Sequence, residues 1–219
     1  MQVREMSRLI QRAANRWGRW IAAYGRYVAS TAKIQWHGRE NIPAEPSIWF
    51  GWHGSNLIGI ALHQSFLPRP AQAFIPPGLV GTTVAGWLEG AQIEPVLLPQ
   101  DGRGNASAAL KAMVRGLSKD GDVMVAVDGP HGPSGWVRPG TFWLGRMTGR
   151  PLVPMGIAAR PAIRYPRWDR HLIPFPRSRL AVVIGKPFRV AREQEIDQPF
   201  LDSMGELIHS VSRLAWEMV

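Results

Sequence analysis

Short apolar runs separated by glycine, proline and polar residues recur along most of the 219-residue chain. Runs of about four to eight aliphatic and aromatic residues bounded by turn formers are typical of buried strands. They predict strands at residues 33–36, 47–52, 73–75, 93–98, 123–127, 151–158 and 180–184. Apolar residues spaced three to four apart predict helices at 56–62, 80–90, 106–117, 140–148 and from residue 199 onward. This alternation predicts an α/β class with a mostly parallel central sheet flanked by helices.

Two stretches depart from the regular alternation. Pro151 and Pro154 favour an edge position or a bulge for the strand at 151–158, because proline cannot donate a hydrogen bond to a ladder. Residues 160–179 combine Trp168, Asp169, His171 and several arginines without a clear period. We therefore expect a long irregular segment there.

Residues 4–29 predict a helix with two unlike faces. An apolar stripe at three- to four-residue spacing consists of Leu9, Ala13, Trp17, Ile21, Tyr24 and Val28. A neighbouring face carries Arg4, Arg8, Arg12 and Arg16, with Arg19 close by. This pattern is typical of a helix lying in the plane of a membrane interface, and a helix packed on the domain with a solvated basic face is the alternative. We expect residues 1–32 to dock on a membrane and residues 33–219 to form the α/β domain.

The charge balance narrows the choice of partner. The chain has 26 Lys and Arg against 16 Asp and Glu, a net charge of +10, which attracts phosphate on anionic lipid or nucleic acid. Ten tryptophans favour the membrane–water interface, and no nucleic-acid-binding motif occurs, so no nucleic-acid partner is expected. No apolar run reaches the roughly 18 residues that a spanning helix needs. We expect a peripheral protein on an anionic membrane surface.

Cysteine is absent, which excludes disulfides, thiolate metal sites and a cysteine nucleophile, and no metal is expected. The candidate chemistry lies instead where two predicted strands end. His53 follows the strand at 47–52, and Asp128-Gly129-Pro130-His131-Gly132-Pro133 follows the strand at 123–127. Ligands bind at the carboxyl edge of such sheets. His53 also precedes a helix, whose N-terminus favours the neutral imidazole that a general base needs. A rigid turn at Asp128 and a structural histidine at His53 are the alternatives.

Taken in order, these motifs resemble the glycerophospholipid (lysophospholipid) acyltransferase superfamily, in particular a bacterial branch with Trp-His-Gly and Asp-Gly-Pro-x-Gly-Pro motifs. The resemblance covers roughly residues 34–188. The matching segments are Gly38-Arg39-Glu40-Asn41-Ile42-Pro43, Trp52-His53-Gly54, the motif at 128–133, Gly149-Arg150-Pro151-Leu152-Val153-Pro154, Trp168-Asp169 and residues 173–179.

The resemblance implies transfer of a fatty acyl group from acyl-CoA or acyl-carrier protein, with no other cofactor, to a hydroxyl of a lysophospholipid or related membrane lipid. It implies that His53 is the catalytic base and that the motif from Asp128 onward binds the acceptor through Gly129, Pro130, His131 and Gly132. It also implies a place in phospholipid biosynthesis at the cytoplasmic face of the cell membrane.

Two positions depart from the superfamily pattern. The superfamily pairs its histidine with an aspartate five positions on, where this chain has Ile58. Either another carboxylate orients His53, with Asp128 as the first choice, or the base is unassisted. A non-catalytic lipid- or envelope-binding relic of the same fold is the alternative. His131 stands where the branch carries arginine, so Arg103 and Arg138 are candidates to bind the acceptor's headgroup.

Overall fold

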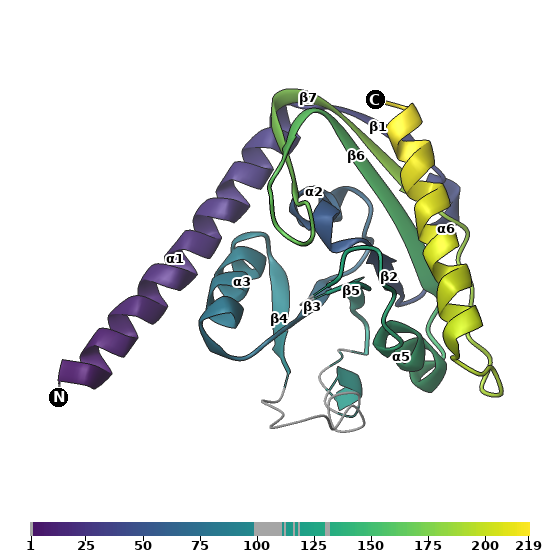
Figure 1. Ribbon diagram of the computed structural model, residues 1–219, viewed down its shortest axis with the longest axis horizontal. Coiled ribbons are helices and arrows are strands. Elements are labelled where there is room, and N and C mark those ends of the chain that lie inside the picture. The colour runs from purple at the N-terminus through teal and green to yellow at the C-terminus, as the bar shows by residue number, and fades with distance from the viewer. Residues whose placement is uncertain (1, 99–110, 112, 116, 118, 130–131) are drawn as a thin grey trace.

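A seven-stranded sheet with the order β1-β7-β6-β2-β5-β3-β4 forms the centre of the protein (Figure 1). The computed structural model describes residues 2–98, 111, 113–115, 117, 119–129 and 132–219. The strands are β1 (Lys33–His37), β2 (Ile48–Gly51), β3 (Ala71–Ile75), β4 (Ile93–Leu97), β5 (Asp122–Ala126), β6 (Leu152–Arg164) and β7 (Leu172–Ile184). Neighbouring strands in this sheet are parallel, apart from the antiparallel pair β6–β7. The predicted fold class is confirmed.

Helices cover both faces of the sheet. They are α1 (Gln2–Thr31), α2 (Asn56–Leu62), α3 (Gly78–Gly90), α5 (Gly140–Thr148) and α6 (Gln198–Glu217), with short 3-10 turns at Arg39–Asn41, His53–Ser55 and His63–Ser65. The helices α1, α2 and α3 lie on one side of the sheet, and α5 and α6 lie on the other (Figure 1). The predicted helix at 106–117 falls mostly outside the described residues.

The strand β6 lies inside the sheet, between β7 and β2, so the expectation of an edge strand is wrong. Pro154 is tolerated there because it is the last residue paired with β2, and the pairing with β7 starts at Met155. The missing N–H of the proline therefore falls where the ladder changes partner, and the Pro154 carbonyl still accepts a hydrogen bond from Gly185 at 2.9 Å. The register shift in this strand lies between Arg160 and Ala162 instead.

The segment at 160–179 is also more regular than its sequence predicts. β6 continues to Arg164 and β7 begins at Leu172, and the two strands pair through Ile163 and Ile173. The outer half of β6 is mostly exposed, so its composition lacks the apolar run that marks a buried strand. The resulting β6–β7 hairpin brings its tip, residues 165–171, back toward the end of β2 (Figure 1).

The predicted N-terminal helix is present as α1, and only part of the predicted apolar stripe, including the buried Val28, faces the domain. The small residues Gly18, Ala22 and Gly25 are buried, and the helix lies close to α3 and α2. Trp17 and Trp20 are instead 64% and 67% exposed. The helix therefore packs on the domain and still presents aromatic side chains outward. Among the described helices, none is both long and apolar enough to cross a membrane.

Candidate active site

The two motifs predicted at strand ends meet at the carboxyl edge of β2 and β5. These strands are paired side by side, with Gly51 opposite Ala126, so the segments that follow them leave the sheet together. His53 begins the 3-10 turn that leads into α2, and its backbone N–H donates to Asp128 Oδ1 at 2.8 Å. Asp128 is fully buried, and its Oδ2 accepts a hydrogen bond from the Gly135 N–H at 3.2 Å. Asp128 therefore holds both loops in place.

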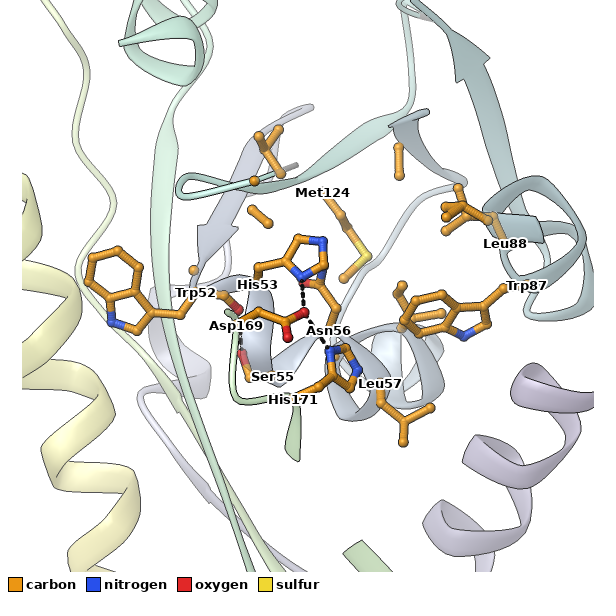
Figure 2. Close-up of a pocket in the computed structure, with 18 of the residues that line it drawn as sticks. Trp52, His53, Ser55, Asn56, Leu57, Trp87, Leu88, Met124, Asp169 and His171 are labelled. Atoms are coloured by element: carbon orange, nitrogen blue, oxygen red, sulfur yellow. Dashed lines mark hydrogen bonds and ion pairs between the residues drawn. The ribbon is translucent and has the colours of Figure 1, made fainter. Parts of the chain in front are cut away.

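The imidazole of His53 pairs with a different carboxylate, that of Asp169. His53 Nδ1 lies 2.9 Å from Asp169 Oδ2, as Figure 2 shows. The expected pairing of this ring with Asp128 is wrong, because the Asp128 oxygens already accept backbone N–H groups. Ile58, at the position of the superfamily aspartate, is 2% exposed within an apolar cluster. The carboxylate that orients His53 thus comes from the β6–β7 hairpin, 116 residues along the chain.

Two glycines allow the hairpin tip to approach His53 this closely. A Cβ at Gly54 would lie 2.4 Å from the backbone oxygen of Asp169, and one at Gly132 would lie 2.5 Å from Cε3 of Trp168. Trp168 also packs on His53, with 5.0 Å between ring centroids. Gly54 and Gly132 are therefore explained by the close approach of the hairpin. The resemblance included Trp168-Asp169, but no residue near it in the sequence indicated that Asp169 pairs with His53.

A second imidazole faces the same carboxylate oxygen. His171 Nδ1 lies 3.4 Å from Asp169 Oδ2 (Figure 2). Burial alone would raise the pKa of Asp169, but His171 and His53 beside it bring that pKa below its usual value. Burial lowers the pKa of His171 by more than the neighbouring Asp169 carboxylate raises it. An ionised carboxylate thus lies between two imidazoles, with His171 neutral.

This arrangement sets the tautomer of His53 when the ring is neutral. An ionised carboxylate only accepts hydrogen bonds, so Nδ1 of His53 carries the hydrogen that is donated to Asp169. Nε2 then carries the lone pair, and it points away from Asp169 (Figure 2). The site therefore holds an oriented nitrogen base.

His53, Asp169 and His171 lie on the wall of a large cavity, with a volume of about 1220 Å³. Most of the wall is apolar and comes from α1, α2, α3 and the sheet; examples are Ile21, Leu57, Trp87, Leu88, Met124 and Ile157. Arg138 and Arg167 bring positive charge to the same wall. The cavity thus combines a large apolar volume with a small polar group of residues around His53.

Comparison with known proteins identifies the fold. No protein-family model matches the chain. Over 177 residues it is 24% identical to an uncharacterized protein of Rickettsia prowazekii (strain Madrid E), covering 78% of this chain and 79% of that protein. The crystal structure of the 1-acyl-sn-glycerophosphate (LPA) acyltransferase PlsC from Thermotoga maritima is similar with a TM-score of 0.56 and 20% identity, over 92% of this chain and 79% of that one. This chain has an acyltransferase-like fold.

Within that fold, the structure brings together part of the predicted site. Gly129 and Arg138 line the cavity with His53, and the Arg138 guanidinium donates to the Gly132 carbonyl. Pro130, His131 and Arg103 lie outside the described residues, so their assignment stays a prediction. Sequence reasoning missed Asp169, His171 and Arg167 as site residues. All three come from the hairpin tip that the sequence predicts as irregular.

Proposed function

We propose that this protein transfers a fatty acyl group from a thioester donor, acyl-CoA or acyl-carrier protein, to a hydroxyl of a lysophospholipid or related membrane lipid. The observation that carries the proposal is the His53–Asp169 pair on the wall of a large apolar cavity. A carboxylate within hydrogen-bond reach of the base favours an enzyme over the alternative, a non-catalytic lipid-binding relic of the same fold.

The proposed reaction starts at Nε2 of His53. This nitrogen takes the proton of the acceptor hydroxyl as the hydroxyl oxygen attacks the thioester carbonyl. Asp169 stays ionised and stabilises the imidazolium that forms. When the tetrahedral intermediate collapses, the C–S bond breaks, the ester C–O bond remains, and His53 returns the proton to the leaving thiolate. The step needs no acyl-enzyme and therefore no cysteine.

The cavity supports a fatty acyl substrate. Its volume of about 1220 Å³ is above the range of roughly 300–1,000 Å³ common for small-molecule sites. Burial of an acyl chain contributes roughly 0.8 kcal/mol per methylene, so an apolar space of this size favours long chains. Arg138 and Arg167 on the same wall are our proposed contacts for an anionic headgroup, together with the predicted Arg103 and His131.

The helix α1 supports docking on an anionic membrane. Its exposed Trp17 and Trp20 also line the cavity, so the aromatic surface and the proposed acyl site adjoin each other. Arg8, Arg12 and Arg16 are exposed on the same helix. We propose that these residues bind the cytoplasmic leaflet and that the acceptor lipid is used at the membrane surface.

The test compares wild type with two variants by mass spectrometry of lipid extracts after incubation with acyl-CoA or acyl-carrier protein. We expect His53→Ala to abolish formation of the acylated lipid. We expect Asp169→Asn to lower the rate by roughly 10²- to 10⁴-fold, because it loses the anion that orients the base. His37→Ala, on the exposed end of β1, is the matched control.

Circular dichroism melts establish that each variant is folded. Full activity in folded His53→Ala contradicts the proposed mechanism. Absence of any product from wild type with every donor, together with vesicle binding, points to the non-catalytic lipid-binding alternative.

A further inference from the structure

The cluster around Asp169 has a second chemical property besides orienting a base. His53, Asp169 and His171 each offer one ligand atom, and these three atoms all lie within 4.8 Å of one another. The hydrogen-bonded candidates are the two Nδ1 nitrogens and Asp169 Oδ2. The two nitrogens are 2.9 Å and 3.4 Å from the shared oxygen. Tetrahedral zinc with bonds of about 2.0–2.2 Å places its ligand atoms roughly 3.3 Å apart. The two nitrogen–oxygen distances are close to that spacing.

The carboxylate itself has unused bonding capacity. The side chain of Asp169 is 1% exposed, and its Oδ1 is buried without a hydrogen-bond partner among the described residues. An unsatisfied buried oxygen on an ionised group costs free energy. A cation bound at Oδ2 would offset part of that cost, because the two oxygens of a carboxylate share one negative charge.

The donor set selects the kind of cation. Two imidazole nitrogens and one carboxylate oxygen suit Zn²⁺ and similar transition metals, whereas Ca²⁺ and Mg²⁺ prefer sites made of oxygen alone. Three protein ligands on a cavity wall also leave the fourth position to water, as in open zinc sites.

We propose that His53, Asp169 and His171 bind one Zn²⁺ ion per chain, and that the bound ion blocks the base. A metal on Nδ1 of His53 replaces the hydrogen that this nitrogen otherwise donates to Asp169. The neutral ring then keeps its single proton on Nε2, the nitrogen that faces away from Asp169 (Figure 2). Nε2 can no longer accept the proton of a hydroxyl. The blocking effect rests on the proposed function, but the binding of the metal does not.

Binding is tested on tag-free, chelator-treated protein in the absence of substrate. Co²⁺ serves as the spectroscopic probe, because tetrahedral Co²⁺ absorbs visible light strongly, and Zn²⁺ is then added as competitor. We expect one equivalent of Co²⁺ to bind wild type and to be displaced by one equivalent of Zn²⁺. His171→Gln and Asp169→Asn should each weaken binding by at least about tenfold, since the first removes an imidazole ligand and the second removes the negative charge of the carboxylate ligand. His209→Gln, a surface histidine stacked on Trp52, is the matched control.

Circular dichroism shows whether His171→Gln and Asp169→Asn are folded. If one of them does not fold, the other still tests the site. No stoichiometric binding to wild type overturns the site. Binding that is unchanged in a folded His171→Gln or Asp169→Asn variant overturns it as well, because the metal then binds elsewhere.

The blocking effect is measured separately, by the initial rate of lipid acylation over a range of free Zn²⁺. We expect inhibition with the same midpoint as the metal titration and full recovery after a chelator is added. Active enzyme that binds Zn²⁺ at this site but is not inhibited overturns the blocking effect. If no acylation is detected, the proposed function fails, while the Co²⁺ titration still decides the metal site.

Discussion

The two faces of the central sheet differ in how completely they are packed. On one face, α6 lies directly on β6, because Gly156, Ala158 and Ala181 present almost no side chain. A Cβ at Gly156 would lie 2.1 Å from the backbone oxygen of Val211. On the other face, α1, α2 and α3 enclose a cavity of about 1220 Å³ against the same sheet. One face is filled to backbone contact, whereas the other combines an apolar core with an open cavity.

The difference assigns the two faces different roles: one mainly stabilises the fold, and the other holds the candidate active site. The face under α6 contributes close packing, which stabilises the fold through many short contacts. On the face under α1–α3, part of the volume is not filled by side chains. The proposed base, its carboxylate and the apolar cavity lie there together. The comparison can be tested by substitutions that add side-chain volume on each face.

The largest effect is expected from Gly156→Ala on the packed face. The new Cβ meets the backbone of α6 rather than a flexible side chain, so the helix must shift as a whole. We expect the free energy of unfolding to fall by about 3 kcal/mol, at the upper end of what overpacking costs. Urea unfolding measures it.

The matched control is Gly140→Ala, where an added Cβ meets nothing within 4 Å. It should change the unfolding free energy by less than about 0.5 kcal/mol. Equal stability of the two variants would contradict close packing of the α6 backbone on Gly156.

A smaller effect is expected when volume is added on the cavity face. Met124→Trp places a larger side chain on the cavity wall, so the fold is kept and cavity space is lost. We expect the preferred acyl chain to shorten by about two methylenes, and affinity for the longest chains to fall roughly tenfold at about 0.8 kcal/mol per methylene.

Displacement of a fluorescent fatty acid by acyl chains of graded length measures this shift without any need for catalysis. Met147→Trp is the control, because Met147 is 54% exposed on α5 and does not line the cavity. An unchanged length profile in Met124→Trp would exclude the cavity as the acyl site.

The smallest effect on the fold is expected from the exposed aromatic residues of α1, at the outer edge of the cavity face. Trp17→Ala with Trp20→Ala removes exposed rings, so the stability of the fold should change little. Binding to vesicles with anionic lipid should weaken roughly tenfold, because two rings no longer enter the interface. Vesicle co-sedimentation measures it, with the 57%-exposed Trp136→Ala as control. Unchanged binding of the double variant would contradict membrane docking through α1.

Much of the fold was predictable from the sequence, because buried strands and helices leave a periodic pattern in the chain. The runs at 47–52 and 123–127 predicted two strands, β2 and β5, and the structure shows that these are neighbours and that the loops after them meet. The β6–β7 hairpin was missed because its outer residues are exposed and carry no such pattern. The edge position expected for β6 failed because Pro154 coincides with a change of ladder partner, which no local rule reveals.

The sequence by itself determined the fold class, the helical N-terminus and the position of His53 at the end of a strand, since each depends on residues close together in the chain. Only the tertiary structure decided which carboxylate faces the imidazole, because Asp169 is 116 residues away and is brought there by a hairpin. It also decided that Asp128 holds backbone N–H groups. The cavity has the same origin: an open volume depends on how helices are spaced over a sheet, and spacing follows from contacts between segments far apart in sequence.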